Sequence, residues 1–299
     1  MKVRSECFRK LMYLINFIIL PMIINPAQSF GGVVNNIRKI KIAIIDTGLS
    51  VKHDYFYGQN GIKKEYLEGN LDTDGHGTHI AGIITRNTIG HDVEIIPIKI
   101  QAYSQDLSLE IHKAIESGAD IINISISGSG DSEKEFLALK TAQQKGILII
   151  VAAGNTYRNE KLSQKPFPAS YKEKLSNIIV VGSINKDYTS PYHYDKDFLP
   201  ELYAFGQNVL SAGLTKDTLI VMSGTSQATA KVTSVAAKIL TTSVIPTDVS
   251  KIKDSIISYS SGEQNALQIT SCFKQNVTSM CLNSPNPEKE LVLTQRLGK

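Results

Sequence analysis

Cysteine is scarce in this chain of 299 residues, which has three cysteines and no tryptophan. Cys7 lies in the N-terminal leader described below, so Cys272 and Cys281 form an isolated pair near the C-terminus. In an exported chain such a pair can form a disulfide that closes a small loop, and the sequence leaves this pairing open. Because no cysteine stands near the motifs that carry chemistry, the sequence argues against thiol catalysis.

Net charge is also small. The whole chain carries +4, and the leader, with Lys2, Arg4, Arg9, Lys10 and Glu6, accounts for +3 of it, which leaves +1. A chain this close to neutral lacks the basic surface that nucleic acids require, so we expect no nucleic-acid partner.

A continuous run of about 20 apolar residues, which a membrane-spanning helix needs, is missing from the N-terminus. The apolar stretch over residues 11–24 is interrupted twice, follows the basic residues and precedes Ala27-Gln28-Ser29, which is typical of a secretory signal peptide. We therefore predict a signal peptide over residues 1–29 and a secreted or periplasmic protein. Pro26 and Phe30 fit a cleavage site imperfectly, so an uncleaved membrane anchor is the alternative.

The composition and the hydrophobic pattern predict one large α/β domain. Hydrophobic residues make up 42% of the chain, enough for a single core. Strand-like runs alternate with helical patterns, and Ser132 to Glu135 reads as a capping box. Such alternation predicts a parallel sheet between layers of helices. The expected strands are 41–45, 93–100, 121–125, 146–151, 177–182 and 218–222, and the expected helices are 108–117, 132–145, 229–240 and 247–258.

Three short motifs stand in a fixed order: IAIIDTG with Asp46, DGHGTHIAG with His76, and SGTSQA with Ser226. Each residue alone has an ordinary explanation, namely a turn aspartate, a core histidine and a helix N-cap serine. Together they supply a carboxylate, a base and a nucleophile, because a serine hydroxyl attacks only when an oriented imidazole takes its proton.

With these motifs in the order Asp, His, Ser, the chain resembles the subtilisin-like serine proteases from about Ile40 to Leu267. The resemblance implies a three-layer fold with a central, mostly parallel sheet and helices on both faces. It also implies a peptidase domain over residues 30–270, followed by a polar tail over 271–299. We expect a monomeric, exported serine endopeptidase that hydrolyses polypeptides through an acyl-enzyme.

The resemblance extends to the oxyanion site, where the string Ala152-Ala153-Gly154-Asn155 matches the family residue for residue. It assigns Asn155 as one donor, with the Ser226 N–H as the other, and a turn asparagine is the alternative. His79 is expected to be structural. A metal site at His76 and His79 is disfavoured, because the expected helical spacing with a glutamate is missing.

The substrate-binding set implied by the resemblance comprises two segments. The first is the substrate strand Asn123 to Gly128, of which Ser125, Ile126, Ser127 and Gly128 would hold an extended peptide. The second contributes Ala152 and Gly154. The family usually has glycine where this chain has Ser127, so either the pocket is narrower or the register is shifted by one residue. Substrate preference is therefore not predicted.

Other departures from the family concern folding and metals. Only Phe30 to Lys41 lies between the leader and the first strand, so we expect no folding prodomain. The chemistry requires no cofactor. The metal ligands are unknown, and Asp54 and Asn87 are only loose candidates for structural calcium. Two alternatives remain: a weakly catalytic subtilisin-fold protein that binds a host partner, and an esterase or a transpeptidase-like acyl transferase.

Overall fold

The computed structural model describes residues 39–50, 53, 56, 62, 68–101, 106–128, 130–156, 165–186, 189–192, 200–242, 249–261 and 292–293. All of them belong to the second of two compact units, Ile37–Lys299. The predicted signal peptide, Asp54, Cys272 and Cys281 lie outside the described residues, as does all of the predicted tail except residues 292–293. None of the described helices is both long enough and apolar enough to cross a bilayer.

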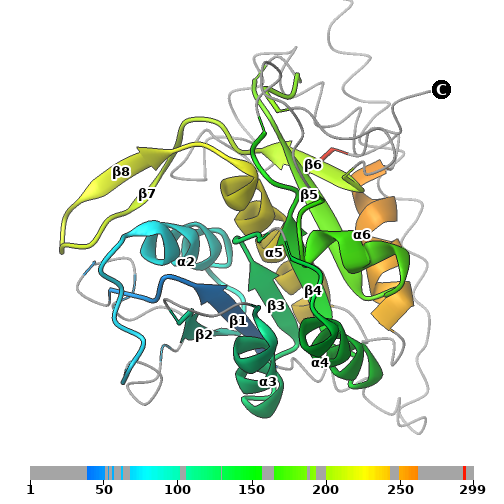
Figure 1. Ribbon diagram of the computed structural model, residues 1–299. Coiled ribbons are helices and arrows are strands. Elements are labelled where there is room, and N and C mark those ends of the chain that lie inside the picture. Colours follow the sequence, from blue (N-terminus) through cyan, green and yellow to red (C-terminus); the bar gives the residue numbers. More distant parts are fainter. Residues whose placement is uncertain are drawn as a thin grey trace, which may run out of the picture. The chain divides into compact units, whose positions relative to one another are not determined.

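The strands form one large sheet and one hairpin (Figure 1). In the large sheet, six parallel strands run in the order β2-β1-β3-β4-β5-β6, and the short β9 adds antiparallel to β6. The hairpin pairs β7 with β8. The strands of the large sheet are β1 Ile40–Asp46, β2 Val93–Lys99, β3 Ile121–Ile124, β4 Leu148–Ala152, β5 Ile178–Ile184, β6 Leu202–Phe205 and β9 Val292–Leu293. The strands of the hairpin are β7 Val209–Ala212 and β8 Leu219–Met222.

Helices cover both faces of the large sheet, which confirms the predicted three-layer α/β fold. Successive residues of a strand point to opposite faces, so Ile42 and Ile44 of β1 enter one core while Ala43 and Ile45 enter the other. The first core also contains α2 His76–Asn87, α5 Thr225–Thr242 and α6 Val249–Ser261. The second contains α3 Ser108–Glu116, α4 Glu133–Gln144 and the short 3-10 helix η3 Ala169–Glu173.

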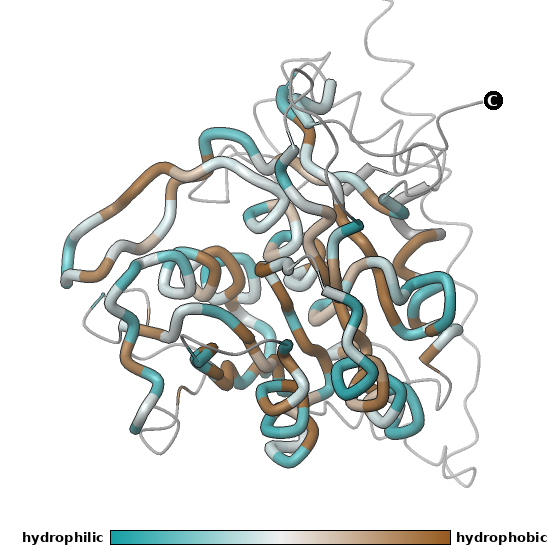
Figure 2. The backbone as a smooth tube through the Cα atoms, in the orientation of Figure 1, coloured by the Kyte–Doolittle hydropathy of each residue, from teal (hydrophilic) through white to brown (hydrophobic). Residues whose placement is uncertain are grey.

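Burial on both faces explains why the strands are nearly continuous apolar runs. A strand of a parallel sheet has no solvent side, so it loses the alternation of a half-exposed strand. All five residues of β4 and all seven of β5 are buried. Figure 2 shows this as hydrophobic colour along the central strands.

The structure differs from the sequence prediction mainly after residue 200. The four-residue strands β6 and β7 were not predicted, because segments this short carry little periodic signal. Helix α5 begins at Thr225, four residues before the predicted start at Thr229, so Ser226 lies inside the first helical turn. A plain N-cap role for Ser226, the alternative considered from sequence, is therefore wrong.

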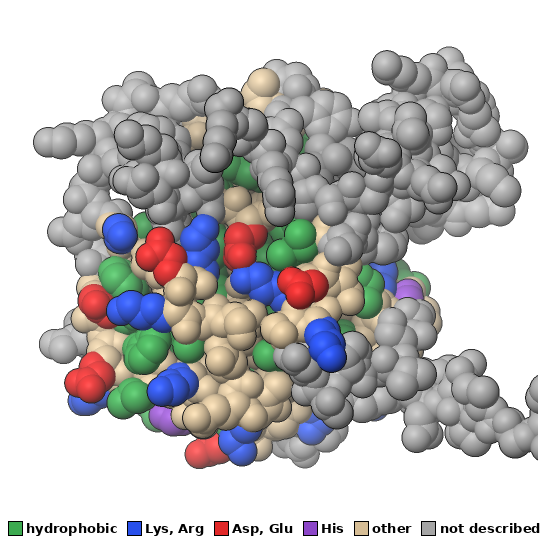
Figure 3. All heavy atoms as spheres, turned by 90° about the vertical axis from the view of Figure 1, so that its right-hand side faces the viewer, with side chains coloured by type: hydrophobic (Ala, Val, Ile, Leu, Met, Phe, Trp, Pro, Cys, Tyr) green, Lys and Arg blue, Asp and Glu red, His purple; other side chains and the backbone are tan. Residues whose placement is uncertain are grey.

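Charged side chains are mixed on the face seen in Figure 3. Over the described residues of this face, Lys and Arg side chains lie among Asp and Glu side chains and do not gather into a patch of one sign. The small net charge of the chain is thus accompanied by a mixed charge distribution on this face.

Candidate active site

The site begins at the carboxyl ends of three neighbouring strands. Asp46 is the last residue of β1, Ser125 follows β3, and Ala152 is the last residue of β4. These strands are adjacent and parallel, so their ends lie along one edge of the sheet, where α/β proteins place ligands. Helices α2 and α5 begin at the same edge and carry His76 and Ser226.

Asp46 and His76 form a direct pair. The Oδ1 atom of Asp46 lies 2.7 Å from Nδ1 of His76 and also accepts the Thr47 N–H at 2.7 Å. The Asp46 carboxylate is almost completely buried, whereas 26% of the His76 side chain is exposed. A neutral imidazole with its hydrogen on Nδ1 therefore presents an unprotonated Nε2 to the open side of the site.

The acidic surroundings of His76 change its pKa. Burial alone lowers this pKa, but the hydrogen bond and the charge of Asp46, with smaller contributions from Asp74 and Asp72, more than offset it. The net result is a pKa raised above the ordinary value of 6.5. An imidazole with a raised pKa is a stronger base, which suits proton abstraction from a hydroxyl.

Asp72 holds the turn that carries His76, and the sequence analysis missed it. Its Oδ1 accepts from the Thr47 hydroxyl at 3.0 Å and from the N–H groups of Asp74 and Gly75 at 2.9 and 3.0 Å. Its Oδ2 accepts from the N–H and the hydroxyl of Thr78 at 2.9 and 2.6 Å. These bonds lower the pKa of Asp72 although burial opposes them. The string Asp-Thr-Asp-Gly, an Asx-turn pattern, could have identified it.

Close backbone packing also fixes this turn. The Gly77 N–H donates to the Thr47 hydroxyl at 2.8 Å, and a Cβ on Gly77 would lie 2.3 Å from the Gly48 carbonyl oxygen. Only glycine fits at this distance. The end of β1 and the first turn of α2 are therefore in backbone contact, which sets the spacing between Asp46 and His76.

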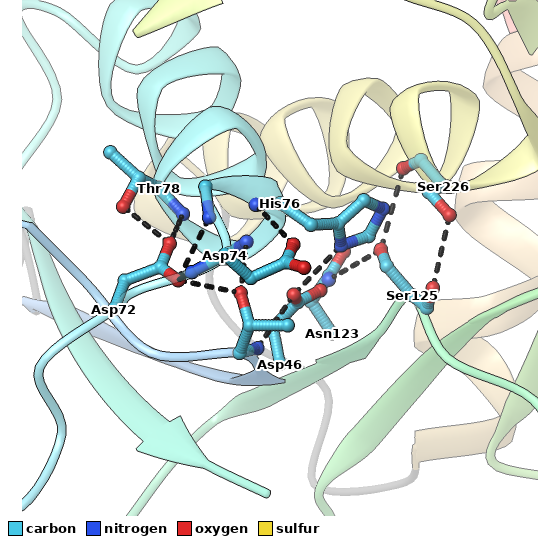
Figure 4. A network of polar contacts seen from close by, with 11 residues as sticks. Asp46, Asp72, Asp74, His76, Thr78, Asn123, Ser125 and Ser226 are labelled. Carbon is cyan, nitrogen blue, oxygen red and sulfur yellow. Dashed lines mark hydrogen bonds and ion pairs between the residues drawn. The ribbon is translucent and has the colours of Figure 1, made fainter. Parts of the chain in front are cut away.

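Ser226 lies in the first turn of α5 and is 6% exposed. Its hydroxyl donates to the carbonyl of Ser125 at 3.0 Å. Figure 4 shows the His76 ring between Asp46 and Ser226. Rotation about the Cα–Cβ bond of Ser226 is thus the motion that would direct the hydroxyl from the Ser125 carbonyl to the imidazole.

A buried polar chain fixes the strand end beside Ser226. Asn123 donates from Nδ2 to the Ser125 hydroxyl at 3.0 Å, and its Oδ1 accepts from the Thr233 hydroxyl at 2.8 Å. Asn123 and Thr233 are completely buried. This contact ties the end of β3 to α5. A polar residue within an apolar strand is the signal that could have indicated it, because a buried amide requires partners.

Asn155 lies next to the nucleophile segment. Its Oδ1 accepts from the N–H and the hydroxyl of Thr225 at 2.8 and 3.0 Å, and Asn155 itself is exposed. The Gly154 N–H donates to the same Thr225 hydroxyl at 3.2 Å, and Gly154 has a φ of 95°. Because the amide oxygen is held by Thr225, the Nδ2 group keeps its two hydrogens for another acceptor.

The predicted substrate-binding residues lie in two environments. Ser125 and Ala152 are buried, Ile126 is half-buried, and Ser127 and Gly128 are exposed. The N–H and the carbonyl of Gly128 both pair with Phe167 at 2.9 Å. Gly128 therefore has no backbone group left for a peptide, and the segment that can pair with one ends at Ser127.

Buried His79 connects α2 to the β7–β8 hairpin through hydrogen bonds. Its Nε2 donates to the carbonyls of Val209 and Ile220 at 3.1 and 3.2 Å, and burial lowers its pKa. The Ser211 hydroxyl in turn donates to the His79 carbonyl at 2.9 Å. Among the described residues, no group of three or more His, Cys, Asp or Glu side chains is arranged to hold a metal ion.

The protein has a parallel sheet between two layers of helices, and the carboxyl edge of this sheet carries a carboxylate, an imidazole, a serine hydroxyl and an amide. This is the architecture of the subtilisin-like class. A family model described as the subtilase family matches residues 38–272. The chain therefore belongs to the subtilase family of serine proteases.

Several curated relatives are named as proteases. Subtilisin DY of Bacillus licheniformis is 30% identical over 230 residues, which cover 72% of this chain and 79% of the relative. Alkaline proteinase of Hapsidospora chrysogena is 33% identical over 206 residues, 64% of this chain and 50% of the relative. The minor extracellular protease Epr of Bacillus subtilis (strain 168) is 30% identical over 205 residues, 64% of this chain and 30% of the relative. The chain thus spans half or less of the length of the last two.

Solved structures show the same fold. The prenylagaramide maturation protease PagA is 26% identical with a TM-score of 0.57, and the match covers 73% of this chain and 82% of PagA. The self-cleaved protease domain of PatA is 24% identical with a TM-score of 0.54 and coverage of 72% and 86%.

Proposed function

We propose that this protein is an exported serine endopeptidase that hydrolyses peptide bonds through an acyl-enzyme on Ser226. The observation that carries the proposal is the 2.7 Å contact between Asp46 Oδ1 and His76 Nδ1 at the sheet edge where α5 presents Ser226. That contact gives the imidazole a fixed orientation and a raised pKa, the two properties that a general base needs.

In the proposed reaction the Ser226 hydroxyl leaves the Ser125 carbonyl and gives its proton to Nε2 of His76 as Oγ attacks the peptide carbonyl. Asp46 stabilises the imidazolium that forms. The Ser226 N–H, at the start of α5, and Nδ2 of Asn155 donate to the oxyanion. His76 then protonates the leaving amine, and water attacks the acyl-enzyme in a second round of the same proton transfers to release the acid.

The bound peptide would extend along the segment from Ser125 to Ser127. Strand addition uses backbone groups, and those of the next residue, Gly128, are already paired with Phe167. Gly128 then acts as a pocket wall and does not pair with the peptide. Ala152 and Gly154 would form the facing side, one at the end of β4 and the other bonded to Thr225.

Export rests on the predicted signal peptide, and the name of the relative Epr, an extracellular protease, supports it. The proposed substrates are polypeptides, the proposed state is a monomer, and the proposed chemistry uses protein groups alone. Calcium, if bound, would be structural.

Labelling with a fluorophosphonate probe tests the proposal, because only an activated serine reacts. We expect labelling of the wild type and no labelling of Ser226→Ala. The control Ser255→Ala, which removes an exposed serine hydroxyl in α6, should be labelled as the wild type is. Folded wild-type protein that fails to react beside a reactive control protease would overturn the enzyme assignment in favour of the binding protein.

Mass spectrometry of the mature N-terminus tests removal of residues 1–29. Product analysis with an added amine separates hydrolysis from acyl transfer.

A further inference from the structure

A buried carboxyl group outside the proposed catalytic machinery connects two helices. Glu135, in the first turn of α4, is 4% exposed. Its Oε2 accepts the N–H of Leu107, the residue that precedes α3, at 2.9 Å. Its Oε1 is buried and has no hydrogen-bond partner. A buried carboxyl with one unpaired oxygen is costly to ionise, so its position calls for an explanation.

The predicted capping box forms only in part, because the bond between the Ser132 N–H and the Glu135 carboxyl is replaced by other bonds. The Ser132 hydroxyl accepts the Glu135 N–H at 3.3 Å, as predicted. In a complete box, the Glu135 carboxyl would accept the Ser132 N–H. That N–H donates instead to the Tyr171 hydroxyl at 2.8 Å, and the carboxyl reaches Leu107. The Ser132 N–H and the Glu135 carboxyl thus do not bond each other, and each bonds a distant segment instead.

Tyr171 extends these contacts to the wall of the proposed peptide site. Its hydroxyl donates to Asp131 Oδ1 at 2.8 Å, and its ring is buried against Phe167 with ring centres 4.9 Å apart. Phe167 forms the two backbone bonds with Gly128 at the end of the substrate segment. A connected path therefore runs from the N-terminus of α4 through Tyr171 to the Gly128–Phe167 bridge.

Acidic groups surround Glu135 from two sides. Asp106, ahead of α3, accepts the Ser132 hydroxyl at 2.6 Å, and Asp131 lies ahead of α4. Burial first, and then the charges of Asp106 and Asp131, raise the pKa of Glu135 to about 7, although the Leu107 N–H opposes this. Tyr171 stays protonated because its own pKa is raised by burial.

Two basic residues near this cluster, Lys134 and Lys174, interact with residues other than Glu135. Burial raises the pKa of Asp106, but hydrogen bonds from Ser108 and Ser132, with a smaller contribution from the charge of Lys134, lower it overall. Lys174 lies over the Phe136 ring, 5.7 Å from its centre.

We propose that Glu135 is a positioning residue for peptide binding, whose loss of a proton loosens the Gly128–Phe167 wall while leaving the Asp46–His76 pair intact. The inference rests on the proposed peptidase function. The neutral carboxyl is not repelled by Asp106 and Asp131, whereas the charged form is repelled by both and buries a charge with one oxygen unpaired. The repulsion acts on the segment that ends in Ser132, and hence on Tyr171.

The direction of the pH effect follows from the raised pKa. The stabilising contribution of neutral Glu135 is fully present below the pKa of an unfolded glutamate, and it is lost as the pH rises through about 7. We therefore expect KM for a protein substrate to rise across this range. A change of roughly fivefold between about pH 6 and about pH 8.5 corresponds to the lower end of typical coupling between sites.

The test compares three variants with fluorescein-labelled casein as substrate. Glu135→Gln keeps the acceptor for Leu107 but cannot ionise, so its KM should stay low and flat with pH. Glu133→Gln removes an exposed carboxylate from the same helical turn and should behave as the wild type. Asp131→Asn keeps the acceptor for Tyr171 but removes a charge that raises the pKa of Glu135, so its KM should begin to rise at a lower pH than in the wild type.

Two further measurements separate the possible failures. The rate of labelling by a small alkyl fluorophosphonate reports Ser226 and His76 alone and should have one pH profile in all variants. Urea unfolding should show Glu135→Gln gaining stability over the wild type as the pH rises through 7. A casein KM whose pH profile is the same in wild type and Glu135→Gln overturns the inference. Absence of labelling in the wild type overturns the proposed function instead.

Discussion

The segments that carry His76 and Ser226 are held in place by different chemistry. The turn before His76 is organised by one buried carboxylate, Asp72, which accepts five hydrogen bonds. The turn before Ser226 is held by neutral groups: the Asn155 amide, the Thr225 hydroxyl and the Ser125 carbonyl. A charged acceptor binds several donors strongly but fails as a unit when it is removed. Neutral contacts are individually weaker, and each can be lost alone.

Removal of Asp72 should have the largest effect on stability. Asp72→Ala leaves three N–H groups and two hydroxyls without their acceptor, so we expect a loss of about 3 kcal/mol or more in the free energy of unfolding. Asp74→Ala is the control, because exposed Asp74 accepts one bond, from the His76 N–H at 3.1 Å, and should cost about 1 kcal/mol. Urea unfolding measures both. Equal losses would show that Asp72 is not the organiser of this turn.

Asn155 tests the neutral segment through catalysis. Asn155→Ala should fold normally, since the side chain is exposed, and should lose about 10²- to 10³-fold in kcat, the magnitude known for an oxyanion-hole asparagine in subtilisin. Little change in KM is expected, because the oxyanion exists only in the transition state. A variant that loses affinity and keeps kcat would assign Asn155 to substrate binding.

Thr225 tests whether orientation of that amide matters. Thr225→Val removes the hydroxyl that donates to Asn155 and accepts the Gly154 N–H, but keeps the side-chain shape and the Thr225 N–H bond. We expect a loss of about 1 kcal/mol of transition-state stabilisation, roughly fivefold in kcat. Thr229→Val is the matched control, because its hydroxyl bonds only the Thr225 carbonyl within the same helix. Equal kcat in both variants would argue against the orienting role.

The smallest expected effect is a shift in the pH at which kcat/KM falls on its acid side. The base form of His76 exists only above its raised pKa, so activity should fall as the pH falls through a value above 6.5. The stabilising pair with Asp46 has the opposite dependence: it is complete below the pKa of an unfolded histidine and is lost as the pH rises through the folded value. A profile with its acid limb below 6.5 would contradict the arrangement of Asp46 and His76.

Much of this architecture was predictable because its signals are local. The buried strands, the glycine-flanked His76 and the helix after Ser226 are each encoded within about ten residues. The contacts that set the geometry are not local: Ser125 and Ser226 are 101 residues apart, and Asn155 and Thr225 are 70 apart. Glu135 shows the limit most clearly. The Ser132 half of its predicted capping box is confirmed, but the Glu135 carboxyl bonds Leu107, which no local pattern indicates.

The position of α5 has a consequence for the newly made chain. This helix packs on β1, β3, β4, β5 and β6 and shares the helical side of one core with α2 and α6, but it is encoded after all of these strands. Until residue 242 has been synthesised, this face of the sheet lacks the contacts of α5, and these contacts are distant in sequence, which slows folding. The same helix brings Ser226. Synthesis therefore delivers the nucleophile only with a helix of the core, after all six parallel strands have been made.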